Sequence, residues 1–258
     1  MKYVDIHSHL NFPGYAGDLD EVIGRMRAAE TGTIVVGTDY ESSRKAVEHA
    51  SRHPNIWACI GVHPADDPEA TFDADAFELL ASNPKTVAVG ECGFDFYHRK
   101  KEEDYERQKA LFLAQIEFAI AHNGPLMIHS RSGEAEVLEV LKPLKEKYGD
   151  KLRGDVHFFA GSLETAKGFW NIGFTTSFTG VITFARDYDP IIKAAPLDML
   201  MSETDAPFVS PEPYRGKRNE PAYVVEVVKK IAEIRGEPFE VVQKAMVENA
   251  TRIFGVGE

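Results

Sequence analysis

The stretch Asp5-Ile6-His7-Ser8-His9 lies close to the N-terminus, and the rest of the sequence is best interpreted outward from it. Apolar residues flank and interrupt its polar residues, which is typical of the end of a short buried strand. Side chains alternate between the faces of a strand, so we expect His7 and His9 to project to one side, with Asp5 beside them. Two neighbouring imidazoles form half of a site for a first-row metal ion. A hydrogen-bonded histidine pair at a strand end is the alternative interpretation.

The composition indicates a globular protein of the cytoplasm. The chain has 258 residues, of which 43% are hydrophobic, and two cysteines, which argues against a disulfide-rich secreted scaffold. Neither a secretory signal pattern nor a membrane-spanning apolar run is recognisable, so we expect no membrane association. The net charge of −12 argues against a basic surface that coats nucleic acid, although a local basic patch or bound metal ions could attract an anionic substrate. No long apolar stripe is left unexplained, so we expect a monomer.

Short apolar or β-branched runs alternate along the chain with longer stretches of helical period. Eight runs are candidate strands: Tyr3–His7, Thr33–Gly37, Ile56–Gly61, Thr86–Gly90, Leu126–His129, Asp155–Phe158, Phe174–Phe178 and Met199–Ser202. Several lack polar alternation, as expected for parallel strands covered on both faces. Eight strands that alternate with helices over about 250 residues favour a (β/α)8 TIM-like barrel, with an open doubly wound sheet as the alternative. No linker-like segment divides the chain, so we expect one domain over residues 1–258.

Five helices can be bounded from their apolar period: Glu102–His122, Ser132–Tyr148, Leu163–Asn171, Pro221–Arg235 and Phe239–Phe254. Asn219 is the candidate N-cap of the fourth of these helices, and Gly236 is its candidate stop signal.

The barrel leads to a sharp expectation, because functional residues in this fold lie at the C-terminal ends of the strands. Polar residues of the kinds that bind metals or phosphate lie at the ends of six of the eight runs or just after them: His7, His9, His63, Glu91, His129, Arg131, His157, Glu203 and Asp205. Core packing alone gives no reason for such residues to gather at one rim. The sequence therefore predicts a metal site at the C-terminal ends of the strands.

Each of these residues also has a structural interpretation. Glu91 could be a buried acid paired with an arginine, although its neighbouring glycines would let a backbone or a ligand approach closely. His129 and His157 could be hydrogen-bonded core residues, and Asp205 could cap the turn that follows it. His63 could equally be a turn residue or a substrate contact. The remaining histidines are predicted to lie at the surface: His49, His53, His98 and His122.

Six motifs occur in order along the chain: Asp5–Leu10, Gly61–Pro64, Gly90–Asp95, Ile128–Arg131, Glu203–Pro207 and Arg215–Pro221. Together they resemble the motifs of the TatD family of metal-dependent deoxyribonucleases, a branch of the amidohydrolase-like metallohydrolases. The resemblance extends to Glu248–Gly255 and so covers essentially the whole chain. One motif departs from the family, in which the sixth strand usually reads Phe-His-Cys-Phe. Here His157 is kept and Phe158 takes the place of the cysteine, which is expected to alter packing or substrate fit nearby.

The resemblance implies a centre that holds two divalent cations. The residues at the matching positions divide into one group for each ion and one bridge: His7, His9 and Asp205, then His129 and His157, with Glu91 between the two ions. Besides the bridging Glu91, Asp205 would act in catalysis as general base toward the attacking water, and Glu203 would orient a ligand. The metal stays open among Mg, Mn, Zn and Co.

Arg131 is the first candidate for a phosphate contact, because its planar guanidinium matches phosphate geometry, and His63 and Arg218 are further candidates. Two basic clusters are expected on the same rim, at residues 99–101 and 215–218. Three aromatic residues adjoin the first cluster and are candidates for stacking on unpaired bases: Phe94, Phe96 and Tyr97. The alternative is that these aromatic residues belong to the loop core and that the lysines form a solvated face.

We therefore predict a metal-dependent phosphodiesterase that trims DNA from an end and prefers single strands. The alternative is an amidohydrolase-type enzyme that cleaves cyclic amides, N-acyl groups or aminoacyl esters. Many two-metal amidohydrolases bridge their ions with a carboxylated lysine on the fourth strand, so Glu91 at this place favours the phosphodiesterase. A non-catalytic metal-binding protein is the third possibility, and the complete set of candidate ligands argues against it.

Overall fold

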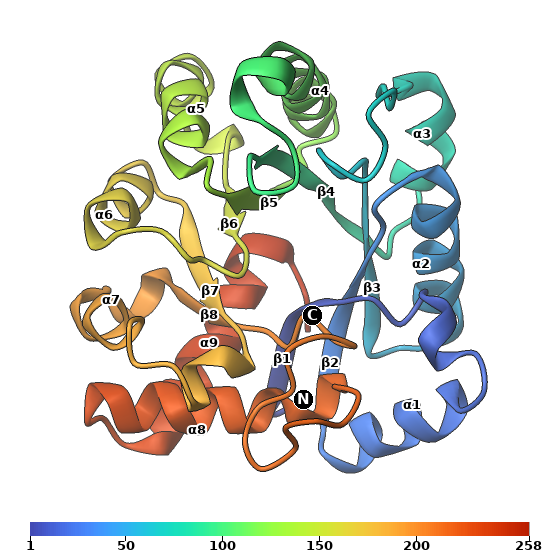
Figure 1. Ribbon diagram of the computed structural model, residues 1–258. Helices are drawn as coiled ribbons and strands as arrows, with labels where there is room; N and C mark the ends of the chain where they lie inside the picture. Colours follow the sequence, from blue (N-terminus) through green and yellow to red (C-terminus); the bar gives the residue numbers. More distant parts are fainter. Residues whose placement is uncertain (258) are drawn as a thin grey trace.

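The computed structural model describes residues 1–257, and its centre is a parallel eight-stranded barrel (Figure 1). The strands are β1 (Tyr3–Ser8), β2 (Thr31–Val36), β3 (Ile56–Ile60), β4 (Thr86–Asp95), β5 (Leu126–Arg131), β6 (Gly154–Val156), β7 (Thr175–Phe178) and β8 (Leu200–Ser202). Each strand pairs in parallel with the next one in sequence, and a bridge between Ser8 and Ala206 joins the last strand region to the first. This order confirms the predicted (β/α)8 barrel and excludes the open doubly wound sheet.

Helices surround the barrel (Figure 1). They are α1 (Leu19–Ala28), α2 (Tyr40–Arg52), α3 (Ala74–Ala81), α4 (Lys101–Ala121), α5 (Glu134–Tyr148), α6 (Leu163–Asn171), α7 (Asp189–Ala194), α8 (Val224–Arg235) and α9 (Phe239–Phe254). Short 3-10 turns occur at Pro13–Tyr15, Gly149–Lys151, Gly180–Thr183, Leu197–Met199 and Pro221–Tyr223. The predicted bounds of α6 and α9 are confirmed, and α8 begins later than predicted because Pro221–Tyr223 forms a 3-10 turn.

The predicted N-cap of α8 is wrong. Asn219 is fully buried, and its side-chain amide donates to the carbonyl oxygens of Thr204 and Phe208, at 2.9 and 2.6 Å. It therefore fastens the loop after β8 to the end of that strand. The predicted stop is confirmed, because Gly236 ends α8 in the left-handed conformation with φ 66°.

Two hydrophobic clusters stabilise the barrel. The larger one lies between the strands and the surrounding helices. The smaller one joins Ile6, Cys59 and Met127 to Phe254 near the end of α9. Because its residues come from strands on opposite sides of the barrel, this cluster fills the barrel interior. Residues at the end of α9 pack against it.

The fourth strand continues to Asp95, beyond its predicted end at Gly90. A Cβ atom on Gly93, whose φ is 140°, would lie 2.1 Å from the carbonyl oxygen of His129, and one on Gly90 would lie 2.2 Å from that of Met127. Only glycine allows such contacts, so these two residues let β4 approach the backbone of β5. The glycines beside Glu91 were expected to allow close approach of a backbone or a ligand, and the structure shows that the backbone of β5 approaches them.

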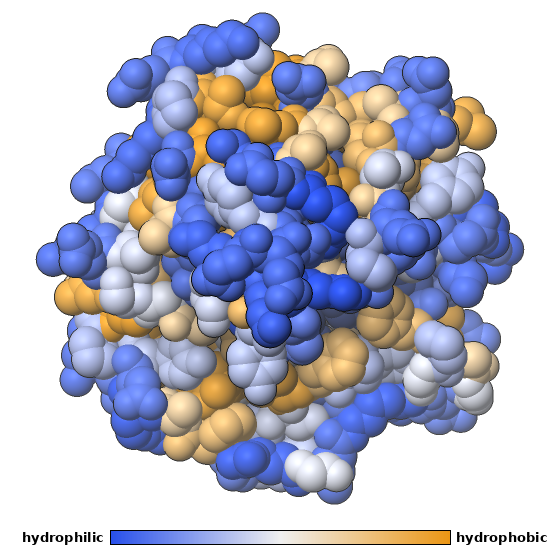
Figure 2. All heavy atoms as spheres, turned by 45° about the horizontal axis from the view of Figure 1, so that its top comes forward, coloured by the Kyte–Doolittle hydropathy of each residue, from blue (hydrophilic) through white to orange (hydrophobic). Residues whose placement is uncertain are grey.

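Hydrophilic residues cover much of the molecular face in Figure 2, and hydrophobic residues gather in a patch toward its top. Among residues 1–257, no helix is both long enough and apolar enough to cross a bilayer.

Candidate metal centre

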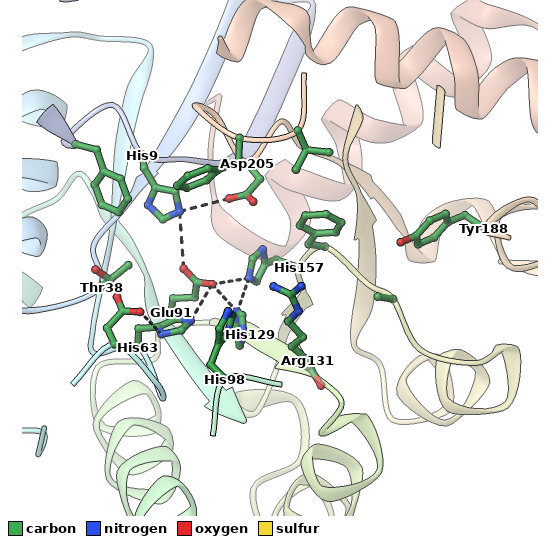
Figure 3. Close-up of a pocket in the computed structure, with 17 residues that line it drawn as sticks. His9, Thr38, His63, Glu91, His98, His129, Arg131, His157, Tyr188 and Asp205 are labelled. Atoms are coloured by element: carbon green, nitrogen blue, oxygen red, sulfur yellow. Dashed lines mark hydrogen bonds and ion pairs between the residues drawn. The ribbon is translucent and has the colours of Figure 1, made fainter. Parts of the chain in front are cut away.

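Glu91, in the second half of β4, occupies the centre of the site at the C-terminal end of the barrel strands (Figure 3). One carboxylate oxygen, Oε1, lies 2.7 Å from Nε2 of His157 and 2.8 Å from Nδ1 of His129. The other, Oε2, lies 3.5 Å from Nε2 of His7 and 3.9 Å from Nε2 of His9. Each oxygen thus faces a different pair of imidazoles. The carboxylate of Glu91 therefore lies between two pairs of potential nitrogen ligands.

Residues on the strand ends form two candidate groups that share Glu91. The potential ligand atoms of His7, His9 and Glu91 lie within 4.8 Å of one another, as do those of Glu91, His129 and His157. The Nε2 atoms of His7 and His9 are only 3.2 Å apart, and Nδ1 of His7 has no hydrogen-bond partner although it is buried. Imidazole and carboxylate donors suit divalent first-row ions. The donor set therefore fits divalent cations.

The imidazoles of His9 and His129 are each held through the ring nitrogen that points away from the site. Nδ1 of His9 lies 3.1 Å from the carbonyl oxygen of Val36 and can only donate to it. Nε2 of His129 lies 3.1 Å from Oδ2 of Asp95. A proton on each of these nitrogens leaves the other ring nitrogen with a free lone pair toward the site, which is the state that binds a metal.

Glu203 lies behind the site and contacts two of the histidines. Its Oε2 lies 3.4 Å from Nδ1 of His157 and 3.9 Å from Nδ1 of His7. Its Oε1 accepts hydrogen bonds from the backbone N–H of Phe158 and from the hydroxyl of Ser177. The side chain is fully buried, so its placement is fixed. A ligand atom of Glu203 lies within 4.8 Å of those of His7 and His157, so the carboxylate can either orient these two rings or join them as a ligand.

Asp205 adopts a left-handed backbone conformation, with φ 54°, just after β8. Its backbone N–H donates to the carbonyl oxygen of His7 at 2.9 Å. Its Oδ1 lies 3.4 Å from Nε2 of His9 and 3.8 Å from Nε2 of His7. An uncommon backbone conformation therefore brings the carboxylate beside the first histidine pair.

The charges within the site compensate one another. Burial raises the pKa of the Glu91 carboxyl, but the imidazoles of His157 and His7 outweigh burial and hold that pKa well below its usual range. Burial lowers the pKa of His157, but the charge of Glu91 outweighs it and raises that pKa well above its usual value. Hydrogen bonds from His129 likewise hold the pKa of the buried Asp95 carboxyl below its usual range, against the effect of burial. The two carboxylates are thus kept ionised, as ligands and their partners need to be.

A cavity of about 630 Å³ opens over Glu91, and it contains two of the three predicted phosphate contacts. Nε2 of His63 lies 3.9 Å from Oε1 of Glu91, while its Nδ1 lies 2.8 Å from Oδ1 of Asp66. Arg131 is exposed and lines the cavity; among residues 1–257 it forms no ion pair, and its guanidinium lies over the ring of Tyr97. The third candidate, Arg218, is not part of the lining.

The position of Arg218 is explained by its partners. Its guanidinium donates to both carboxylate oxygens of Asp18, at 2.8 and 2.6 Å, and to the carbonyl oxygen of Gly14. It also lies over the ring of Tyr15, with 4.4 Å between Cζ and the ring centroid. Arg218 therefore fastens the loop after β8 to the segment before α1, and the structure does not bring it to the site.

Asp5 does not join the two histidines beside it. The register of β1 against β2 shifts between Asp5 and Ser8, which breaks the simple alternation of faces. The carboxylate accepts hydrogen bonds from the backbone N–H of Thr204 at 2.8 Å and from its hydroxyl at 2.7 Å. It also accepts one from the hydroxyl of Thr33. Asp5 thus links β1 to both of its neighbours in the barrel.

Two of the three aromatic residues expected on the rim belong to the core instead. Phe94 is fully buried and stacks on Tyr105, with 5.6 Å between ring centroids, and Phe96 packs against Phe94. Tyr97 is 67% exposed. In the neighbouring basic cluster, Lys101 pairs with Glu136, so part of its charge is neutralised.

Several residues of the site were not among the predicted site residues. His98 is exposed, as predicted, but it also lines the cavity, and its Nδ1 lies 2.7 Å from Oδ2 of Asp95. Asp95 itself could have been found, because Glu91 and Asp95 are four residues apart on one strand and therefore share a face. Phe12 and Phe208 also line the cavity, and no sequence pattern marked them.

Comparisons with known proteins agree with this geometry. The model of the family described as TatD related DNase matches residues 4–255. An uncharacterized metal-dependent hydrolase, YabD of Bacillus subtilis (strain 168), is 39% identical over 98% of both chains. The 3′-5′ ssDNA/RNA exonuclease TatD of Klebsiella pneumoniae (strain 342) is 31% identical over 98% of this chain and 97% of its own.

A crystal structure of YJJV, a TatD homologue from Escherichia coli K12, superposes with a TM-score of 0.90 at 28% sequence identity. The superposition covers 99% of this chain and 98% of that one. The fold, the clustered histidines and carboxylates, and these relatives agree, so the chain belongs to the TatD family of metal-dependent hydrolases.

Proposed function

We propose that this protein is a metal-dependent phosphodiesterase that removes nucleotides from the ends of single-stranded DNA. The observation that carries the proposal is the carboxylate of Glu91, which presents one oxygen to His129 and His157 and the other to His7 and His9. Such an arrangement suits a pair of ions that share one bridging ligand. Relatives named as single-strand exonucleases support the choice of substrate.

We assign one ion to His7, His9 and Asp205, and the other to His129 and His157, with Glu91 shared. When bound, the two ions supply Lewis acidity to the phosphate and make a nucleophile available at neutral pH. Glu203 and Asp95 act as positioning residues, because each holds a histidine ring in the orientation described above. The donor set is compatible with Mg, Mn, Zn or Co.

The residues of the cavity wall perform the remaining steps. Asp205 faces the cavity, so its carboxylate can take a proton from the water that attacks the phosphorus atom. The guanidinium of Arg131 lies over the ring of Tyr97 and forms no ion pair among residues 1–257, so its N–H groups are available to contact the phosphate. His63, held through Nδ1 by Asp66, presents Nε2 to the same space. These two side chains would orient the phosphate over Glu91.

The test is an assay of chelator-stripped protein to which Mg, Mn, Zn or Co is added back singly. The substrates are a single-stranded DNA oligomer labelled at either end, an N-acyl amino acid and a dihydropyrimidine. We expect metal-restored shortening of the oligomer, which the two labels will resolve into a direction of cleavage. Asp205→Asn should abolish it, and His53→Gln, a change outside the cavity lining, should not. Hydrolysis of an amide substrate while the oligomer stays intact would overturn the proposal.

The ligand assignment has a separate test. Metal analysis of purified protein should find less metal in Glu91→Ala than in the unaltered chain, because both groups of ligands lose the shared carboxylate. Equal metal content in the two proteins would refute the assignment.

A further inference from the structure

We propose that the mouth of the barrel carries two stacking sites for unpaired bases, one formed by Phe208 with Phe12 and the other by Tyr97 with Arg131. An unpaired strand that lies across the mouth would place neighbouring bases on the two sites and the phosphate between them over Glu91. This inference rests on the proposed phosphodiesterase function, and it adds how the substrate strand is held.

The first site is formed by residues that follow β8 and β1. Phe208 is 49% exposed and lines the cavity together with Phe12. The two rings meet edge to face, with centroids 6.4 Å apart. Phe12 in turn stacks on the imidazole of His9 at 4.4 Å, so the pair is anchored directly to a candidate ligand. An exposed aromatic face next to the reaction centre is therefore held on a fixed support.

The second site is formed by residues at the ends of β4 and β5. Tyr97 is 67% exposed, and its backbone N–H donates to Oδ1 of Asp95 at 3.0 Å, which fixes the turn that carries it. The guanidinium of Arg131 lies over the tyrosine ring, with 4.1 Å between Cζ and the centroid. Arg131 also lines the cavity, so this site is continuous with the space above Glu91. A flat arginine–tyrosine pair offers both a planar surface and a positive charge to a nucleotide.

The topology places the two sites on opposite sides of the metal centre. The strands follow one another around the barrel in sequence order, so β8 and β1 lie opposite β4 and β5. Figure 3 shows His9 and Asp205 on one side of Glu91 and His98 and Arg131 on the other. A strand that contacts both sites must therefore pass over the ligands between them.

Large exposed hydrophobic side chains are scarce in residues 1–257. Those that are exposed are Met1, Tyr40, Leu79, Tyr97, Phe208 and Val241. Two of these six lie at one cavity: Phe208 is part of its lining, and Tyr97 packs against Arg131, which is also part of the lining. Their shared location at the cavity, rather than their exposure alone, points to a ligand. Every base has a flat face, and stacking tolerates any sequence, but it requires a base that is not already in a duplex. Two such sites therefore favour single strands of any sequence.

The experiment uses DNA oligomers that lack one base, either at the terminal or at the adjacent nucleotide of the end that is trimmed. Loss of one stacked base should lower kcat/KM about 5- to 150-fold in the unaltered protein, as expected for one base–aromatic stack. Phe208→Ala should lose its sensitivity to one of these two positions, and Tyr97→Ala should lose its sensitivity to the other. Tyr97→Phe should restore the sensitivity, and Leu79→Ala, which changes an exposed side chain outside the cavity lining, should behave as the unaltered protein does.

A binding measurement makes the test independent of cleavage. The fluorescent base 2-aminopurine, placed at each of the two positions in turn, should change its emission when the oligomer binds, and each alanine variant should abolish the change at one position. If the unaltered protein cleaves no oligomer with any metal, the proposed function fails, and this titration still decides about the stacking sites. If both variants retain the response at both positions, or if only one variant has an effect, the two-site arrangement is wrong.

Discussion

Replacement of Asp95 by asparagine should weaken metal binding while leaving the fold intact. In the unaltered protein, Oδ1 of Asp95 accepts the backbone N–H groups of Tyr97 and His98, and Oδ2 accepts Nδ1 of His98 and Nε2 of His129. An asparagine would keep its oxygen on the two backbone N–H groups and turn its amide group toward the histidines. The Nε2 atom of His129 would then have to accept, which moves the ring proton to Nδ1, the atom that faces Glu91.

The magnitude follows from the kind of contact that is lost. Removal of a carboxylate that orients a metal-binding histidine typically costs 10- to 100-fold in metal affinity or activity. We therefore expect metal affinity to fall by about that factor, which corresponds to about 1.4–2.7 kcal/mol of binding free energy. The free energy of unfolding without metal should also fall, because the contacts of the ionised carboxylate with two imidazoles are lost, but the protein should still fold because asparagine has the shape of aspartate and keeps both backbone hydrogen bonds.

The assay is a competition titration with a coloured chelator, using Zn or Co, with thermal unfolding of the metal-free protein beside it. His98→Gln is the matched control, since it removes the other contact to the same carboxylate oxygen and leaves that of His129. We expect the control to bind metal within about twofold of the unaltered protein. If Asp95→Asn is folded and binds metal with unaltered affinity, the role of Asp95 as a positioning residue is refuted.

Three further predictions concern other parts of the structure. Gly93→Ala should lower the free energy of unfolding by about 3 kcal/mol or more, measured by denaturant titration, because its Cβ would lie 2.1 Å from a carbonyl oxygen of β5 at a positive φ. An unchanged unfolding midpoint would contradict this reading of the strand contact. Metal at 100 times its dissociation constant should stabilise the chelator-stripped protein by about 2.7 kcal/mol, and a melting temperature that does not respond to any of the four metals would contradict the proposed centre. Arg131→Ala should lower kcat/KM on the oligomer about 10- to 100-fold, with only partial recovery in Arg131→Lys, whereas Arg218→Ala should lower the melting temperature and leave kcat/KM within about twofold. A loss of activity in Arg218→Ala together with unchanged activity in Arg131→Ala would contradict both assignments.

The barrel was predictable because two periodicities alternate along the whole chain. Each strand run has its own apolar signal, and the rule that functional groups follow parallel strands predicts Glu91, His129 and Asp205 on one rim. The structure brings these side chains together, as expected. The ends of the strands were less predictable. For example, β4 continues past Gly90 because of contacts with β5 that depend on tertiary structure.

The remaining differences involve partners that lie far away in sequence. Arg218 looked available for phosphate, but its charge is taken by Asp18, which meets it only in the folded chain. Asn219 looked like a helix cap, but its amide is used by the loop after β8. Phe94 looked like a rim residue, yet α4 covers it with Tyr105. In each case the local sequence indicates which interactions a side chain can form, and the partner that it contacts in the folded protein comes from a distant segment.

The contact between β1 and β8 has a consequence for how the ends of the chain are joined. These strand regions meet through the bridge between Ser8 and Ala206, through backbone hydrogen bonds from Asp205 and His9, and through the carboxylate of Asp5. The proposed ligands lie on both sides of this junction. A cation bound there would cross-link the first strand to the last, closing a loop that contains most of the chain, as a disulfide does elsewhere. Unlike a disulfide, this cross-link would form and open with the supply of metal.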